Sequence, residues 1–409
     1  MLLNSNKFKF IRTQRYDITN APPNVVEDRN GTLIWLLRTW KDKNYWYFEI
    51  FQGNAFDVYP IETLIPENIL EKLRHDDKTC LYIANTHEAF LDIIEPLYRS
   101  LVIEANIPPR KIYVANEAAD LHIEMRKFAD KYQYEYFNIE WLLEFEYSMS
   151  IRANQCKLNS NAMLLDKPYP KRYLNFNRRW RLHRPTIVAL LHAKGLLDKG
   201  YVSMAPSDDG RDWEKMVPWM INFNEKDEEL YQLLKSHEHE LLNLPPLYLD
   251  TDELVNNRAD FEKSSLYLYE NSLVSLVNET NYYTHYAAES ARFLSEKIFK
   301  PIAVGHPFII ASVPKTLELL KCLGYKSFHP FIDESYDDEF DDFERMKKIL
   351  REVEKISNMT DSEVSEFIKN VKPICEHNQE LLKSKTVPFI IGSDPECKIL
   401  HSHFVRKML

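Results

Sequence analysis

The stretch KPYPKRYLNFNRRWRLHRPTIVALLHAKGLLDKGYVS, residues 167–203, indicates the fold of this chain. Its apolar run at residues 172–177 is typical of a buried strand, and the run that begins with Pro185 has the spacing of a helix with proline in its first turn. A second strand-like run follows at residues 201–206. Strand, helix and strand in this order form a βαβ unit, which predicts a parallel sheet.

The same alternation continues on both sides of this stretch. Thr360 and Glu363 have the spacing of a capping box, which predicts that a long helix begins there. Together these patterns predict an α/β protein. Further strands are expected at residues 79–88, 111–119, 272–280 and 307–312, and further helices at 90–107, 315–324 and from 361 to about 385.

The chain has 409 residues, which is too long for one ordinary core and fits two domains of roughly 150 to 200 residues each. An Asn- and Pro-rich stretch at residues 159–170 is the expected linker, with the boundary near Asp166. The predicted division is an acceptor-side domain at 1–165, a Rossmann-like nucleotide-binding domain at 166–385 with a helical insertion near 207–263, and a tail at 386–409.

Composition excludes several classes of protein. The net charge of -10 disfavours a protein that coats nucleic acid non-specifically, since neutralising phosphates requires clustered Lys and Arg. The sequence holds neither a signal peptide nor about 18 consecutive apolar residues, so we expect a cytoplasmic protein without a membrane span. Five scattered cysteines indicate reduced thiols. Eight glycines against 23 tyrosines suggest AT-rich coding, as in many bacteriophages, which would place the protein in the host cytoplasm.

The run at residues 167–184 contains seven cations and no acid. Most of its arginines lie where a predicted strand leads into a helix, at the carboxyl edge of the sheet, where anionic ligands bind. Guanidinium groups match diphosphate oxygens in paired hydrogen bonds, so we predict that Arg178, Arg179 and Arg181 bind phosphate. The alternatives are a solvated basic edge or ion pairs with the acidic run 333–344. The seven cations are Lys167, Lys171, Arg172, Arg178, Arg179, Arg181 and Arg184.

A second group of charged residues surrounds the next predicted strand and helix. Glu279 ends the strand, and Glu296, Lys297 and Lys300 lie in the first turns of the helix. A carboxylate at this place can accept hydrogen bonds from ribose hydroxyls, and lysines can balance a diphosphate. The alternative is capping of the first helical turn by Glu296.

Two blocks of sequence resemble one family. The block at residues 295–337, with SEKIFKPIAVGHPFI and IDESYD, is similar to glycosyltransferases found in bacteriophages and marine microbes, as is NFNRRWRLHR with GLLDKGYVS at 175–203. The Glu-Lys element also resembles the donor site of fucosyltransferase-like and exostosin-like enzymes. The resemblance implies a GT-B-like fold, with two Rossmann-like domains facing across a cleft and a nucleotide sugar, such as a UDP-sugar, held by the second. It implies that Arg178 and Lys297 lie near the diphosphate and that Glu296 lies near the sugar or ribose.

If the reaction inverts the sugar, the first domain must supply a general base for the attacking hydroxyl. Two predicted strands end in candidate residues: IANTHE ends in His87 and Glu88, and VANEAAD carries Glu117 and Asp120. We favour Glu88 as the catalytic base, with His87 next. The alternative is that these side chains cap helices.

Other polar residues predict no further chemistry. His285, His306 and His377 lack the spacing of metal ligands, so we expect an enzyme that requires no metal. The acidic run at residues 333–344 is expected to be a solvated face that begins a helix.

These features favour a glycosyltransferase that moves a sugar from a nucleotide sugar to a hydroxyl. Phage-like composition and the resemblance favour hydroxymethylated cytosine in double-stranded phage DNA as the acceptor, and an arabinosyltransferase is one specific form of this activity. The seven cations are numerous enough to share between donor and DNA backbone. Two alternatives stay open: a glycosyltransferase of surface glycans or proteins, and a non-catalytic module that binds nucleotides or glycans.

Overall fold

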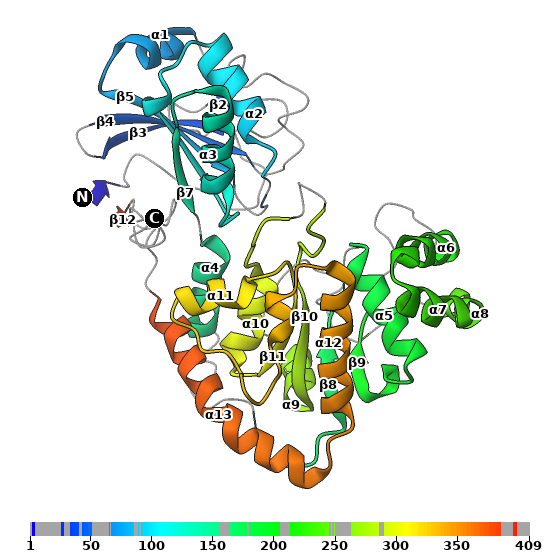
Figure 1. Cartoon of the computed structure of the whole chain (residues 1–409). Coiled ribbons are helices and arrows are strands. Elements are labelled where there is room, and N and C mark those ends of the chain that lie inside the picture. Colours follow the sequence, from blue (N-terminus) through cyan, green and yellow to red (C-terminus); the bar gives the residue numbers. More distant parts are fainter. Residues whose placement is uncertain are drawn as a thin grey trace. The chain divides into compact units, whose positions relative to one another are not determined.

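The chain divides into two compact units. Each contains parallel strands and helices, so the predicted α/β class is confirmed (Figure 1). The first unit comprises Met1–Glu144, Ala287–Phe293 and Thr386–Leu409, and the second comprises Phe145–Tyr286 and Leu294–Lys385. The computed structural model describes residues 2–4, 26–27, 33–40, 43–50, 65, 67–85, 89, 91–141, 143–155, 164, 166–177, 180–204, 213–244, 247, 249, 263–285, 290–385 and 396–398.

The second unit is built on a four-stranded parallel sheet in the order β11-β10-β8-β9. All neighbouring pairs are parallel, so the four carboxyl ends lie at one edge. The chain adds β9 on one side of β8 and β10 on the other, which makes the junction of β8 and β10 a topological switch point, the place where such sheets bind ligands. The strands are β8 (Lys171–Asn175), β9 (Gly200–Val202), β10 (Ser272–Asn278) and β11 (Phe308–Ala311), in the segments predicted from the sequence.

Helices cover both faces of this sheet. α5 (His183–Ala193) connects β8 to β9, and α10 (Glu296–Val304) connects β10 to β11. Because right-handed crossovers that leave in opposite directions place their helices on opposite faces, α5 and α10 lie on different sides. α12 (Asp342–Ser357) packs against β8, β11 and α5, whereas α13 (Asp361–Ser384) packs against α10 (Figure 1).

Local signals set the ends of these helices. Ser295 is the N-cap of α10, and Gly305 ends that helix in the left-handed region, with a φ of 67°. Thr360 and Glu363 form the predicted capping box at the start of α13, and the helix extends almost to the predicted end. The carboxyl-terminal half of the unit therefore begins and ends its helices where the sequence indicated.

The described part of the insertion expected near residues 207–263 is mostly helical, and Leu247 forms an isolated antiparallel bridge with Met204. α6, α7 and α8 pack against one another, and α7 also contacts α5. α9 follows and packs against β10 and α10. The bounds are α6 (Trp213–Phe223), α7 (Glu228–Ser236), α8 (Glu238–Leu242) and α9 (Lys263–Glu270).

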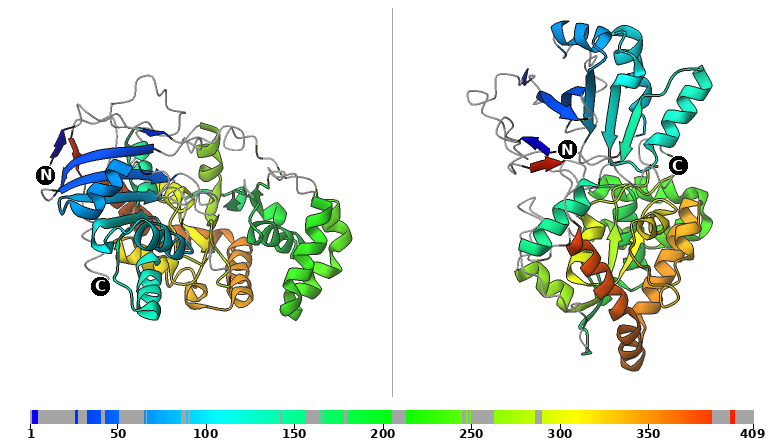
Figure 2. Two further views of the ribbon diagram at one scale, coloured as in Figure 1. Left: turned by 90° about the horizontal axis from the view of Figure 1, so that it is seen from above. Right: turned by 90° about the vertical axis from the view of Figure 1, so that its left-hand side faces the viewer.

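The first unit contains a six-stranded sheet in the order β2-β3-β4-β5-β6-β7. Strands β4 to β7 are parallel, and β2 and β3 extend the sheet antiparallel. A separate antiparallel pair joins β1 to β12, the blue and red arrows in Figure 2. The strands are β1 (Leu2–Asn4), β2 (Val26–Glu27), β3 (Leu33–Trp40), β4 (Lys43–Ile50), β5 (Thr79–Asn85), β6 (Ile112–Asn116), β7 (Asn138–Trp141) and β12 (Glu396–Lys398); the helices are α1 (Glu67–His75), α2 (Ile94–Leu97), which continues as a π-helix over Tyr98–Glu104, and α3 (Leu121–Tyr132).

The units divide at the start of α4 (Glu144–Gln155), whereas the sequence placed the boundary near Asp166. A buried contact explains why α4 belongs to the second unit. The Glu146 carboxylate, 1% exposed, accepts a hydrogen bond from the Tyr325 hydroxyl at 2.7 Å and pairs with the Lys385 ammonium at 3.1 Å. The linker composition on which the sequence prediction relied carries no information about such a contact.

The acidic run at residues 333–344 begins α12 as predicted, but the prediction of a solvated face is wrong for Glu334, Asp337 and Asp342, which are buried. Asp337 is 8% exposed and Asp342 is 6% exposed. The Asp337 carboxylate accepts hydrogen bonds from two backbone N–H groups at the start of α11 (Thr316–Cys322), at 2.9 and 3.2 Å. Burial raises the pKa of Asp337 to about 6. These acids therefore hold helices and loops together inside the unit.

Candidate functional site

Three buried asparagines connect the strand ends at the switch point of the second unit. The Asn177 amide donates to Asn175 Oδ1 at 2.6 Å, and the Asn278 amide donates to Asn177 Oδ1 at the same distance. Asn175 in turn donates to the Leu276 carbonyl of β10 at 2.7 Å. Because buried amides are costly unless they are hydrogen-bonded, this network fixes β8 and β10 relative to each other.

Glu279 follows β10 directly and is fully buried. Its carboxylate accepts from the Ser295 hydroxyl at 2.6 Å, from the Ser295 backbone N–H at 3.2 Å and from the Thr280 backbone N–H at 3.1 Å. Burial raises the pKa of the Glu279 carboxyl, while the Lys297 ammonium and the hydrogen bonds from Ser295 oppose the rise. The carboxylate predicted to meet ribose thus fixes the N-cap of α10 to the end of β10.

Lys297 lies in the first turn of α10 with its ammonium surrounded by oxygen atoms. Lys297 Nζ lies 3.2 Å from Thr280 Oγ1, 3.0 Å from Ser295 Oγ and 3.2 Å from Glu296 Oε1. Three acceptors match the three protons of an ammonium group. Burial opposes ionisation of Glu296, but the adjacent Lys297 and Lys300 ammonium groups lower its pKa to about 2. A cation, an ionised carboxylate and the N-terminus of α10 therefore meet at one point of the switch edge.

A histidine and an arginine at the start of α5 both donate hydrogen bonds to the backbone at the carboxyl end of β10. His183 Nε2 donates to the Glu279 carbonyl at 2.9 Å, and Arg184 donates to the same oxygen at 3.1 Å. Both side chains are buried. Burial and the Arg184 cation lower the pKa of His183 well below its usual range, so the ring is neutral at neutral pH. The His183 ring stacks on the Tyr282 ring, with 5.2 Å between the ring centroids.

The seven-cation run does not form one cluster. Lys171 and Arg172 lie at the amino end of β8, the opposite end from Asn175. Lys171 donates to the Asp198 carbonyl at 2.5 Å, and Arg172 donates to the Met359 carbonyl at 3.2 Å. Because consecutive residues of a strand extend along the sheet, these two cations lie away from the carboxyl edge, where the sequence predicted phosphate binding by Arg178, Arg179 and Arg181.

Several predicted site residues lie outside the described part of the chain. These are Arg178 and Arg179 of the predicted donor site and the favoured base candidates His87 and Glu88. Arg181, which follows the two arginines, is partly buried just before α5. Lys300 is partly buried one turn after Glu296 on α10. The structure therefore brings together Glu279, Glu296 and Lys297, with Lys300 on the same helix.

The other acidic candidates for a base belong to the first unit. Asp120 is paired with Arg292 in a two-pronged contact, with Nη2 to Oδ1 at 2.6 Å and Nε to Oδ2 at 3.2 Å. The Ala119 N–H donates to the Arg292 carbonyl at 3.0 Å, so backbone and side chain hold the same segment. Glu117 is 2% exposed. Asp120 therefore ties Arg292 to the segment that follows β6.

The three histidines considered as metal ligands make separate contacts. His306 accepts from the Ser275 hydroxyl at 2.9 Å and donates to the Ser272 carbonyl at 2.8 Å. Burial lowers the pKa of His306 to about 4. His377 contacts a backbone carbonyl, and His285 contacts a carboxylate on α12. Among the residues that the structure describes, no group of three or more His, Cys, Asp or Glu could hold a metal ion.

Sequence reasoning missed several residues of this edge. Asn175, Asn177 and Asn278 escaped notice because an asparagine after a strand is usually a turn residue. Ser295 and Thr280 are neutral and carry no charge signal. The signal that could have found them is the pairing of NFN and NET at the ends of two adjacent strands of one parallel sheet.

Comparison with proteins of known structure finds several distant likenesses. A UDP-forming α,α-trehalose-phosphate synthase from Burkholderia xenovorans is 11% identical with a TM-score of 0.38, and the match covers 79% of this chain and 75% of that one. A second structure of such a synthase from the same species, in complex with glucose-6-phosphate, is 9% identical with a TM-score of 0.37, covering 82% and 77%. S. aureus TarM, in complex with Fondaparinux, α-GlcNAc-glycerol and UDP, is 13% identical with a TM-score of 0.30, covering 90% and 66%.

No model of a known protein family matches the sequence, and no curated protein matches it. Identities and TM-scores this low do not assign an activity, so the function is argued from the residues of this chain. Within the described residues, no helix is both long and apolar enough to cross a membrane.

Proposed function

We propose that this chain is a nucleotide-sugar-dependent glycosyltransferase that binds the donor diphosphate at the N-terminus of α10. One observation carries the proposal. At the switch point of the second unit, Ser295 caps α10 while Lys297 Nζ lies within 3.2 Å of three oxygen atoms. A helix N-terminus combined with a lysine at a switch point is an arrangement suited to a diphosphate.

The proposed chemistry follows from the charge that develops on the leaving group. When the bond between sugar and diphosphate breaks, negative charge grows on the diphosphate, and cations held in place beforehand stabilise it. Lys297 is held in this way by Thr280 and Ser295. Arg178 and Arg179 are proposed to add paired hydrogen bonds, as the family resemblance implies.

Glu296 gives the site a specific property. Its carboxylate is ionised because its pKa is about 2, and it lies 3.2 Å from Lys297 Nζ. An incoming diphosphate competes with this carboxylate for the same ammonium group. We propose that binding moves Glu296 from Lys297 to the sugar or ribose hydroxyls, for which a carboxylate is a suitable acceptor. A UDP-sugar is the proposed donor.

Hydroxymethylated cytosine in double-stranded DNA is the acceptor that we propose, on the strength of the phage-type resemblance and composition. The fold leaves fewer cations for a DNA backbone than the sequence suggested, because Lys171 and Arg172 lie at the other end of β8. A hydroxyl of a surface glycan or protein is the alternative acceptor, and the experiment below separates it from DNA by whether a sugar is found on the base.

The test measures nucleoside diphosphate release from a mixed pool of nucleotide sugars, together with mass spectrometry of nucleosides from hydroxymethylcytosine-containing DNA. We expect release by the wild-type protein and a loss of about 10²-fold in Lys297→Met. Lys369→Met, an exposed substitution on α13, is the matched control and should keep full activity. A sugar adduct on the base supports the DNA acceptor, whereas release without an adduct points to another hydroxyl. If no nucleoside diphosphate is released from any donor, the proposal that this chain is an enzyme is contradicted.

A further inference from the structure

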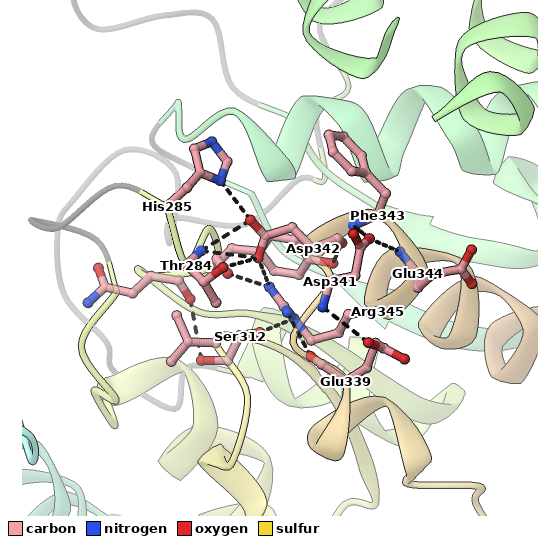
Figure 3. Close-up of polar contacts among 12 residues, drawn as sticks. Thr284, His285, Ser312, Glu339, Asp341, Asp342, Phe343, Glu344 and Arg345 are labelled. Atoms are coloured by element: carbon pink, nitrogen blue, oxygen red, sulfur yellow. Dashed lines mark hydrogen bonds and ion pairs between the residues drawn. The ribbon is translucent and has the colours of Figure 1, made fainter. Parts of the chain in front are cut away.

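His285, on the loop that follows β10, is hydrogen-bonded to Asp342 at the start of α12 (Figure 3). We propose that His285 of the second unit, rather than Glu88 or His87 of the first, is the general base of the transfer reaction and that Asp342 is the positioning residue that orients it. This inference rests on the proposed glycosyltransferase function and deepens it by naming the group that takes the acceptor proton. It also fixes the stereochemical course of the reaction.

The contacts of Asp342 hold the His285 ring in one orientation. Its side chain is 5% exposed, and it accepts from His285 Nδ1 at 2.8 Å. Thr284 donates to the same carboxylate through its backbone N–H and its hydroxyl, both at 3.1 Å. Arg345 Nη2 donates to Asp342 Oδ1 at 2.6 Å. Figure 3 shows Asp342 between His285 and Arg345. A carboxylate with this many donors is fixed in position and charge.

Arg345 fixes the aspartate in turn. Its side chain is 1% exposed, and it donates to the carbonyls of Tyr282, Ser312 and Glu339 at 2.6, 2.9 and 2.9 Å. The guanidinium therefore connects α12 to the loop after β10 and to the loop after β11. The His285, Asp342 and Arg345 side chains, together called the clamp, all lie within the second unit.

His285 differs from its partners because its side chain is 41% exposed. The ring stacks against Phe223 of α6 at 5.8 Å with an interplanar angle of 23°, and it contacts Tyr283 edge-on at 5.6 Å. Since an ionised carboxylate can only accept, Nδ1 donates in this contact, and Nε2 is the ring nitrogen that can accept a proton. A partly exposed ring held at Nδ1 by a buried carboxylate is the arrangement required of a histidine base.

A chain of contacts links this pair to the donor edge. Arg345 bonds the carbonyl of Tyr282, whose ring stacks on His183 at 5.2 Å. His183 in turn donates to the carbonyl of Glu279, which holds the cap of α10. His285 and Lys297 are therefore positioned by one continuous set of buried side chains at the carboxyl end of β10.

The proposed step balances as follows. The acceptor O–H proton moves to His285 Nε2, and an oxygen lone pair forms the new bond to the anomeric carbon. The bond from that carbon to the diphosphate breaks, and its electron pair leaves with the nucleoside diphosphate. The resulting imidazolium is stabilised by Asp342. A single displacement of this kind inverts the configuration of the anomeric carbon.

A purely structural role for His285, as a clamp on the loop, makes different predictions. His285→Asn retains an N–H donor near the position of Nδ1 and so keeps the bond to Asp342, but it removes the basic nitrogen. A clamp survives this substitution, whereas a base does not. His285→Gln is the complementary variant, because it places a nitrogen near the position of Nε2 without basicity.

The experiment compares these two variants with the wild-type protein and with His377→Asn, a change at a half-buried histidine on α13. We measure donor affinity and kcat with hydroxymethylcytosine-containing DNA as the acceptor. We also measure the formation of glycosyl azide from added azide and the configuration of the product. We expect unchanged donor affinity, a loss of about 10²- to 10⁴-fold in kcat for both His285 variants, and restored turnover with azide, which needs no proton removal.

The outcomes separate the two proposals. If the wild-type protein binds no nucleotide sugar, the proposed function fails, and the inference fails with it. If the wild-type protein turns over and His285→Asn stays within about threefold of it, the function stands and the general base is not His285. Retention of configuration in the product overturns the inference in the same way.

Discussion

The hydroxyl of Ser295 donates to the buried carboxylate of Glu279 at 2.6 Å. This bond joins the N-cap of α10 to the residue that follows β10, and both residues lie at the carboxyl edge of the sheet. Because Lys297 Nζ lies 3.0 Å from the same Ser295 oxygen, the position of the proposed diphosphate-binding cation depends on Glu279. Glu279 is thus a positioning residue for the donor site.

Replacing Glu279 with glutamine tests this dependence. The amide nitrogen cannot accept from Ser295, so one buried donor loses its partner, at a cost of about 1–3 kcal/mol in stability. We expect a lower midpoint of thermal unfolding and at least tenfold weaker nucleotide binding than in the wild-type protein. Calorimetry on the same sample gives both values. Unchanged nucleotide affinity in a destabilised variant would show that Glu279 supports the fold but not the cation.

Arg345→Met removes the buried guanidinium from the clamp. Asp342 then retains its charge without its cationic partner, and loss of one member of a buried ion pair costs about 3–5 kcal/mol. The expected result is a clear decrease in the unfolding temperature, measured by circular dichroism. Arg351→Met on the same helix is the control, because that side chain is 61% exposed and its loss should change stability by about 0.5 kcal/mol or less.

Much of the second unit could be predicted from the sequence because its signals are local. Apolar runs gave the four strands, and the residue types at helix ends gave the starts of α10 and α13. The same residue types at helix ends predicted that Lys297 lies beside a helix N-terminus.

What the sequence did not reveal depends on contacts between distant segments. Lys171 is four residues before Asn175, roughly 13 Å along an extended strand, so a run of cations in sequence becomes two groups in space. Asp342 was expected in solvent because acids usually are, but its partners Thr284 and Arg345 come from another loop and from the next turn of its own helix. Burial of a charge is decided by such partners.

His306 predicts an acid-sensitive contribution to stability. Burial lowers its pKa from 6.5 to about 4, so the unfolded chain takes up a proton at higher pH than the folded unit does. This contribution is therefore complete above about pH 6.5 and is lost as the pH falls toward 4, on the order of 2 kcal/mol between pH 7 and 5. We expect the unfolding midpoint of His306→Gln to fall less between these pH values than that of the wild-type protein. Parallel shifts in both proteins would contradict the assignment.

Thr360→Ala removes one half of the capping box of α13. The threonine side chain accepts from the Glu363 N–H at 3.3 Å, while the Glu363 carboxylate accepts from the Thr360 N–H at 2.7 Å. We expect a loss of about 1 kcal/mol, read from chemical denaturation monitored by far-UV circular dichroism. Ser362→Ala in the same exposed turn is the control and should be nearly neutral. Equal effects of the two substitutions would argue against capping as the cause.

Equilibrium binding of uridine diphosphate to the wild-type protein and to Lys297→Met, measured by isothermal titration calorimetry, tests the donor site most directly. The proposed site predicts saturable binding by the wild-type protein and by Lys369→Met, with affinity at least tenfold lower in Lys297→Met although the variant remains folded. Equal affinity in all three proteins, or no binding to the wild-type protein, would contradict a diphosphate site at the N-terminus of α10.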